Sequence, residues 1–94
     1  MIKRFKESLD TAVFTTKFVL SEKSPILYVF HYEEDGSWQF SGSEENLTDD
    51  DYKVISLKEM INLDSSVLDI SDLSEGYMAY RKTISDSWVI EPII

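Results

Sequence analysis

The chain has 94 residues and no cysteine. Disulfide bridges, thiolate nucleophiles and thiolate metal sites are therefore excluded, and the composition fits a reducing compartment. Histidine is almost as scarce, because His31 is the single one, and no G-x-S-x-G or S-x-x-K pattern supplies a serine nucleophile. We therefore assign no catalytic residue and expect the domain not to be an enzyme. His31 is expected to be an ordinary strand residue with one side in water.

Long apolar runs are missing as well. No stretch approaches the roughly 18 apolar residues that a membrane span needs, and no apolar segment follows the basic start to make a secretory signal. The three glycines are scattered, so there is no glycine-rich phosphate loop. We expect a cytoplasmic protein with no cofactor and no contact with membranes.

Basic residues are few, since nine Lys and Arg stand against eighteen Asp and Glu, for a net charge of −9. Such a chain repels nucleic acid and anionic lipid but attracts a basic protein surface. The candidate partner-binding residues are Glu33, Glu34, Asp35, Glu44, Glu45, Asp49, Asp50 and Asp51. None of these clusters has the spacing of a calcium loop, so we assign no metal site. The competing explanation for the acidic residues is ordinary solubility.

Apolar and aromatic residues are plentiful, at 43% and 13% of the chain, enough for a single acidic domain over residues 1–94. The segment 26–32, ILYVFHY, is apolar or aromatic on both faces, which is typical of a central or covered strand. A hairpin turn follows, either at 35–36 or at 34–36, and 37–42 forms the return strand.

The two turns predict different cores. A two-residue turn places His31 opposite Phe40. A three-residue turn places Phe30 opposite Phe40 and Tyr32 opposite Trp38. We favour the three-residue turn, because it gathers aromatic residues into cross-strand pairs worth about 0.2–1 kcal/mol each relative to alanine pairs.

Helices are predicted at three places. The first ten residues carry apolar side chains, Ile2, Phe5 and Leu9, at helical spacing. The S-x-x-E box that begins at Ser56 starts a helix that ends near residue 63. Asp64 is placed to cap a second short helical piece, SSVLDI.

The remaining elements are short strands. They are expected near 12–16, at 53–56, and in a C-terminal hairpin of 77–84 with 87–91, while 17–21 either continues the first strand or turns. The sum is an α+β fold, an antiparallel sheet of about four to six strands with two hairpins and short helices packed on one face.

Several short motifs, each weak by itself, follow one another in a characteristic order along the chain. They are Thr15-Thr16-Lys17, Gly36, Trp38, Phe40, Ser56-Leu57, Glu59, Asp64, Leu73, Gly76, Ala79, Arg81 and Trp88. Over roughly residues 12–90 this order resembles a family of small bacterial domains of unknown function, some of whose members are grouped with the immunity proteins of polymorphic toxin systems. Ser74 departs from the family pattern, where proline is expected. The resemblance implies a non-enzymatic domain that binds a toxin, and it implies no catalytic residues.

Charge and resemblance together predict a non-enzymatic protein-binding domain, a monomer or weak homodimer, that presents acidic loops to a basic partner such as a toxin. One alternative is a small-molecule-binding or enzymatic fold, in which His31, Tyr28 or Arg81 meets carboxylates in a pocket between sheet and helices. Another is a structural or oligomerising module that pairs exposed aromatic residues of two copies. Arg81 itself is expected to stack on an aromatic ring or to pair with an acid of the neighbouring strand.

Overall fold

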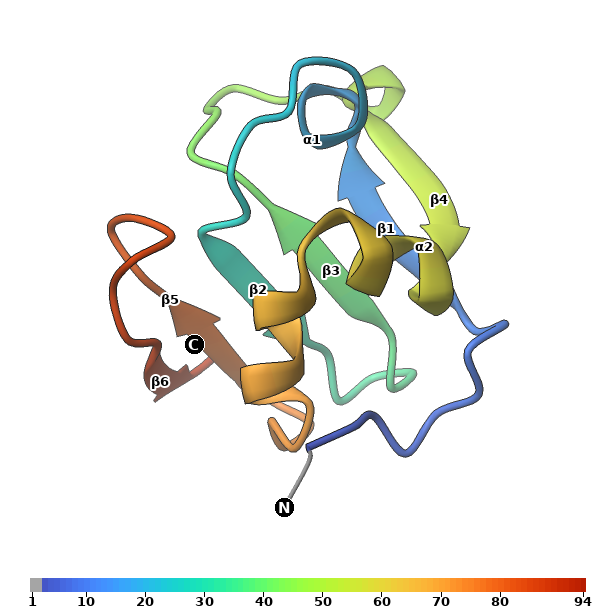
Figure 1. Cartoon of the computed structure of the whole chain (residues 1–94), viewed down its shortest axis with the longest axis vertical. Helices are drawn as coiled ribbons and strands as arrows, with labels where there is room; N and C mark the ends of the chain where they lie inside the picture. The colour runs from blue at the N-terminus through green and yellow to red at the C-terminus, as the bar shows by residue number, and fades with distance from the viewer. Residues whose placement is uncertain (1–2) are drawn as a thin grey trace.

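A computed structural model describes residues 3–94 as one six-stranded sheet with short helices (Figure 1). The elements in chain order are β1 Ala12–Thr16, α1 Lys17–Ser21, β2 Tyr28–His31, β3 Trp38–Ser41, the 3-10 helix η1 Asp49–Asp51, β4 Tyr52–Ser56, α2 Leu57–Leu63, the 3-10 helix η2 Ser65–Ile70, β5 Tyr77–Tyr80 and β6 Val89–Pro92. The predicted α+β class, strand number and two hairpins are confirmed. None of these described helices is long and apolar enough to cross a lipid bilayer.

The strand order is β4-β1-β3-β2-β5-β6. Every neighbouring pair is antiparallel except β1 and β3, which run parallel with Phe14 opposite Gln39. The sheet is therefore mixed, although mostly antiparallel. β2 lies between β3 and β5, in the interior of the sheet, as its apolar character on both faces predicted.

The hairpin of β2 and β3 has neither of the two registers considered above. His31 lies opposite Trp38, and Val29 lies opposite Phe40. The turn between the strands spans residues 33–36, one residue more than the three-residue turn that the sequence favoured. The predicted three-residue turn is therefore wrong. It would have placed Trp38 and Phe40, the two aromatic residues of β3, on the opposite face of the sheet.

Core burial explains the observed register. Trp38 is 1% exposed and Phe40 is 0% exposed, both packed under the helices. Burying a large aromatic side chain contributes roughly 1.5–3 kcal/mol, which exceeds what a cross-strand aromatic pair adds. The longer turn is closed by a hydrogen bond from the amide of Tyr32 to the carbonyl of Ser37, at 2.9 Å.

The predicted N-terminal helix is absent from the described segment 3–11, and Ile2 lies outside the described residues. Phe5 is buried, but Leu9 is exposed, so no continuous apolar stripe faces the core. The backbone serves another purpose, because the carbonyls of Leu9 and Thr11 accept hydrogen bonds from the first two amides of α2, at 3.0 and 2.8 Å. A helix leaves those amides without internal partners, so this contact ties the N-terminal segment to the start of α2.

The other helices begin at short-range caps. Residues 17–21, which the sequence predicted either to continue the first strand or to turn, form α1. The hydroxyl of Thr16 accepts a hydrogen bond from the amide of Val19 in its first turn, at 3.3 Å. Ser56 accepts from the amide of Glu59 at 3.1 Å, and Asp64 accepts from the amide of Ser66 at 3.0 Å. Both predicted N-caps are therefore confirmed.

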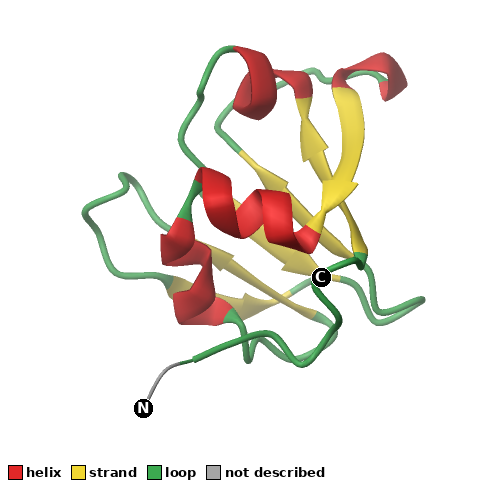
Figure 2. Cartoon of the chain, turned by 45° about the vertical axis from the view of Figure 1, so that its right-hand side comes forward, coloured by secondary structure: helices red, strands yellow, loops and turns green. Residues whose placement is uncertain are grey.

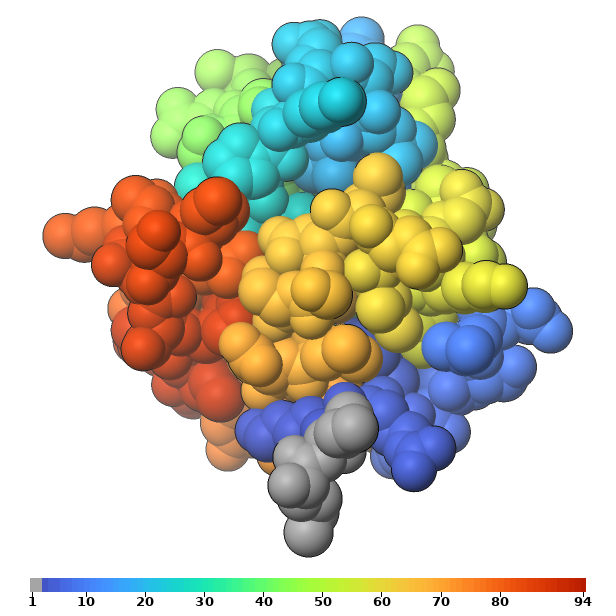
Figure 3. All heavy atoms as spheres, in the orientation of Figure 1, coloured from blue at the N-terminus to red at the C-terminus, as the bar shows by residue number. Residues whose placement is uncertain are grey.

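The helices cover only one side of the sheet (Figure 2). In the space-filling view α1, α2, η2 and the N-terminal segment hide most of the strands (Figure 3). The core lies between these segments and the sheet, and its largest fully buried apolar side chains include Trp38, Phe40, Leu57 and Met60. Because strand side chains alternate, the other half of them points to the side that no helix covers.

Candidate protein-interaction face

The uncovered side of the sheet, called here the open face, is rich in aromatic side chains. Directly paired residues point to the same side of a sheet, so the strand register defines its members. The apolar and aromatic ones are Phe14 of β1, Tyr28 and Phe30 of β2, Tyr32 just beyond β2, Tyr52 and Val54 of β4, Met78 and Tyr80 of β5, and Val89 of β6. Six aromatic rings therefore belong to the side of the sheet opposite α2 and η2.

The rings of Phe14, Tyr28 and Tyr52 are exposed, whereas the other three are half-buried, and four of the six stack in pairs. Phe14 is 40% exposed and Tyr28 is 37% exposed. The rings of Tyr28 and Tyr80 stack with centroids 6.5 Å apart, and those of Phe30 and Tyr32 stack at 5.8 Å. Contiguous exposed apolar surface of this kind marks interaction sites in folded proteins. Rigid aromatic rings also lose little conformational entropy when a partner binds.

Acidic groups border the open face. Within residues 3–94, Glu91 of β6 is the one charged residue at a strand position that points to this side. Its carboxylate is the main cause of the raised pKa of Tyr80. The pKa of Tyr32 is raised by burial first, then by Tyr52 and by the carboxylate of Glu34. Both phenols therefore stay neutral near neutral pH, and the field at the face favours cations.

The predicted acidic residues do not form one continuous surface. Residues 33–35 form the turn that precedes β3, whereas 43–51 follow its other end, so the two groups lie at opposite ends of the sheet (Figure 1). Asp49, on the 43–51 side, lines a shallow hollow of the open face beside Phe14 and Tyr52. The two acidic loops thus approach the same face from opposite ends.

Three of the eight predicted acids already hold the fold together. Asp35 accepts from the amide two residues later at 3.0 Å, Glu44 accepts from the hydroxyl of Ser24 at 2.7 Å, and Asp51 pairs with Lys17 at 3.1 Å. The others make no ion pair within residues 3–94, and they are Glu33, Glu34, Glu45, Asp49 and Asp50. These five carboxylates remain accessible to a partner.

His31 lies on the covered side and is buried, which corrects the expectation of a half-wet strand residue. It is 2% exposed, and its ring stacks on that of Trp38 with centroids 3.9 Å apart. The Nδ1 atom lies 2.7 Å from the carbonyl oxygen of Leu73, which can only accept, so Nδ1 carries the proton. The Nε2 atom then faces Glu7 Oε2 at 3.8 Å. The N-terminal segment and the chain around Leu73 cover this end of the sheet.

A small polar hollow of about 310 Å³ adjoins this histidine. Glu7 Oε2 accepts from the indole nitrogen of Trp38 at 2.9 Å. The atoms His31 Nε2, Glu7 Oε1 and Ser71 Oγ are buried without hydrogen-bond partners in the described chain. Such atoms are commonly bridged by ordered water. Within residues 3–94, no group of three or more histidine or carboxylate side chains is arranged to hold a metal ion.

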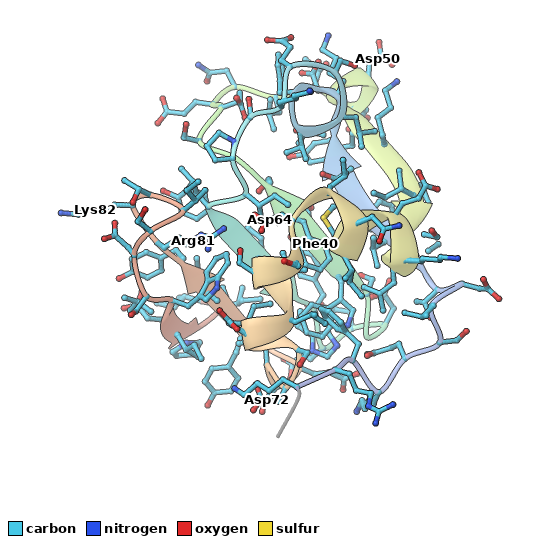
Figure 4. The ribbon with its side chains drawn as sticks, viewed as in Figure 1. Phe40, Asp50, Asp64, Asp72, Arg81 and Lys82 are labelled. Carbon is cyan, nitrogen blue, oxygen red and sulfur yellow. The ribbon has the colours of Figure 1, made fainter. Side chains whose placement is uncertain are left out.

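Arg81 makes both kinds of contact that the sequence suggested. Its guanidinium lies 4.0 Å from the centre of the Trp88 ring, and its Nη2 atom lies 3.1 Å from Asp64 (Figure 4). The acid comes from the junction of α2 and η2, however, and not from a neighbouring strand. Nε and Nη2 also donate to the carbonyl of Ile26, at 3.1 and 2.9 Å. These contacts tie the helical layer to the sheet.

The side chains named for a pocket between sheet and helices lie apart. Tyr28 points to the open face and His31 to the covered side, because they sit at positions of opposite parity on β2. His31 pairs with Tyr77 at the start of β5, whereas Arg81 follows the end of that strand. Each side chain therefore has its own separate surroundings.

Sequence reasoning missed most of the open face. Phe14, Tyr52 and Tyr80 belong to three different strands, and nothing local in the sequence shows that they share a side. One signal was present, because Tyr28, Phe30 and Tyr32 alternate along a single strand opposite an equally apolar set. Such a strand needs a cover on both faces, and the helices supply only one.

Comparisons with known proteins add no family to these observations. No protein-family model matches the chain, and no curated protein or solved structure is significantly similar to it. The geometry and charge of the open face are therefore the features that indicate a function.

Proposed function

We propose that the chain is a non-enzymatic protein-binding domain that receives a basic protein on its open face. The observation that carries this proposal is the one-sided cover of the sheet, which leaves six aromatic rings outside the core. Tyrosine and other aromatic side chains are enriched at the centres of protein interfaces.

Charge supports a basic partner. The net charge is −9, and the face is bordered by carboxylates of Glu34, Asp49 and Glu91. Complementary charge steers the encounter and selects among partners. Aromatic side chains can also stack on the bases of single-stranded nucleic acid. Such proteins need a basic groove that follows the phosphate backbone, and the carboxylates around the open face would repel this backbone. A basic toxin is the partner that the resemblance to immunity proteins suggests.

A second candidate is self-association through the same face, because exposed aromatic rings can pair two copies. The acidic border opposes it, since two copies bring carboxylates of like sign together. Sedimentation velocity of the purified chain over a wide concentration range separates the two candidates. We expect a monomer, and a stable dimer that disappears in an open-face variant would favour self-association instead.

The first test places a photo-crosslinking residue at one of two exposed apolar positions. Val54 lies on the open face and is 59% exposed, whereas Leu63 ends α2 on the covered side and is 50% exposed. After irradiation in the cells that produce the protein, we expect a basic protein to be joined to the Val54 position alone. A partner joined only at the Leu63 position would contradict the proposal.

Direct binding then tests the identified partner after purification. We expect the double variant Tyr28→Ser with Tyr80→Ser to weaken binding by about tenfold or more, because it removes a stacked pair from the face. The matched variant Leu63→Ser removes a comparably exposed apolar side chain from the other side and is expected to bind like the parent. Equal binding by all three chains would refute the open face as the interface.

A further inference from the structure

The open face contains a shallow hollow of about 280 Å³ whose lining is distinctive. The lining residues come from three strands, from η1 and from the two positions that flank the hairpin turn, and they are Phe14, Tyr32, Ser37, Gln39, Asp49 and Tyr52. Three aromatic rings, one carboxylate and two neutral polar side chains therefore border a single small space. This volume suits one side-chain head group and is small for a whole drug-sized ligand.

We propose that this hollow binds the guanidinium group of an arginine side chain supplied by the partner. This inference rests on the proposed function, because the arginine belongs to the basic protein that the open face receives. Aromatic ring faces carry negative partial charge and attract cations, and guanidinium also stacks flat on them. The carboxylate of Asp49 supplies a full opposite charge at the edge of the same hollow.

The local ion pairs leave this carboxylate unused. Lys17 lies near the same end of the sheet, but its Nζ atom is held by Asp51 at 3.1 Å. Within the described chain, Asp49 makes no ion pair. The hollow therefore has a carboxylate that no cation within residues 3–94 neutralises and that is available to a cation from outside the chain.

The polar lining suits a planar donor. Gln39 Oε1 accepts a hydrogen bond from the hydroxyl of Tyr32 at 3.3 Å, which restrains the amide that lines the hollow. A carbonyl oxygen has two acceptor sites, so one remains for an incoming donor. Guanidinium offers five N–H donors in one plane, and it can therefore meet the carboxylate and the amide while stacking on a ring.

The test is an NMR titration of the purified chain with a capped Gly-Arg-Gly peptide. Its control is the same peptide with citrulline, which keeps the planar shape and loses the charge. We expect the arginine peptide to shift the backbone signals of Phe14, Gln39 and Tyr52, and the citrulline peptide to bind about tenfold more weakly. Equal shifts with both peptides, or none with either, would overturn the proposal.

Two neighbouring acids give a matched pair of variants. Asp49→Asn removes the carboxylate that lines the hollow, whereas Asp50→Asn makes the same change of charge one residue away. We expect Asp49→Asn to weaken binding of the arginine peptide about tenfold, and Asp50→Asn to weaken this binding less than about twofold. Equal losses would mean diffuse attraction by the acidic chain and would overturn the site.

The two proposals fail in different ways. Suppose that a partner crosslinks at Val54 and requires Tyr28 and Tyr80, but binds the Asp49→Asn chain as tightly as the parent. This result would support the open face as the interface and refute the arginine site. An arginine peptide that binds the hollow while partner crosslinks come only from the helical side would support the site and refute the face as the protein interface.

Phe14→Leu keeps an apolar side chain but removes a ring, and we expect it to weaken binding of the arginine peptide severalfold.

Discussion

The carboxylate of Asp64 and the guanidinium of Arg81 meet at 3.1 Å, and the same carboxylate caps η2 through the amide of Ser66. Arg81 is almost completely buried and also lies against the ring of Trp88. One acidic side chain therefore both starts a helix and neutralises a buried cation. These roles lie at the junction of the helical layer and the sheet.

We expect Asp64→Ala to lower the free energy of unfolding by about 3 kcal/mol, because it removes a helix cap and leaves a buried guanidinium without its counter-charge. Urea denaturation followed by circular dichroism measures the change. Asp69→Ala, an exposed acid on η2, is the control and is expected to stay within about 0.5 kcal/mol of the parent. Equal losses for the two variants would contradict the assigned role of the ion pair.

The tautomer of His31 is a second prediction. Its Nδ1 atom donates to the carbonyl of Leu73, so the neutral ring should carry its proton there and leave Nε2 bare. Long-range ¹⁵N–¹H correlation spectra distinguish the two ring nitrogens directly. A spectrum in which Nε2 carries the proton of the neutral ring would be incompatible with this hydrogen bond.

Acid stability should depend on Asp51. Hydrogen bonds from Thr48, then the contact with Lys17, lower the pKa of this carboxyl in the folded chain below its ordinary value of 3.8. Its stabilising contribution is therefore present above that value and is lost as the pH falls through the folded-state pKa. We expect Asp51→Asn to be less stable than the parent at neutral pH, and the difference to shrink in acid.

The control for this pH dependence is Asp50→Asn, which makes the same change of charge at a residue without an ion pair. Thermal unfolding at several pH values compares the three chains. If Asp50→Asn reproduces the whole pH dependence of Asp51→Asn, the effect comes from net charge and not from the contacts of Asp51.

The turn of the β2–β3 hairpin requires a left-handed residue. Gly36 has φ of +72°, a conformation that costs most other residues about 1 kcal/mol or more. We expect Gly36→Ala to lower the free energy of unfolding by about this amount and Gly36→Asn to lower it less, because asparagine tolerates the conformation better. A Gly36→Ala chain as stable as the parent in urea would show that the turn relaxes without strain.

Local features of the fold could be predicted because their causes are local. Ser56 and Asp64 cap their helices through amides two or three residues away, and the sequence contains both partners of each contact. The alternating aromatic residues of β2 likewise identify a central strand. The C-terminal hairpin follows from two short β-prone segments around a turn.

Contacts between distant segments could not be predicted in this way. The register of the first hairpin depends on Trp38, whose ring packs against Phe5 of the N-terminal segment. The burial of His31 depends on Glu7 and Leu73, which lie far from it and from each other in the sequence. The open face depends further on which side of the sheet the helices pack against. From its charge pattern the sequence predicted only acidic residues that border this face, such as Glu34 and Asp49.

The position of β1 has a consequence for the order in which the chain folds. It precedes the other five strands of this sheet in the sequence, but its two neighbours are β3 and β4, and Ala12 pairs with Ser56. Contacts between segments this far apart form slowly, because a long loop must close before they contribute. The edge of β1 that pairs with β4 therefore stays unpaired until residues 52–56 have been synthesised, whereas β3 at residues 38–41 becomes available earlier. The later hairpin strand β6, by contrast, joins a sheet whose interior is already complete.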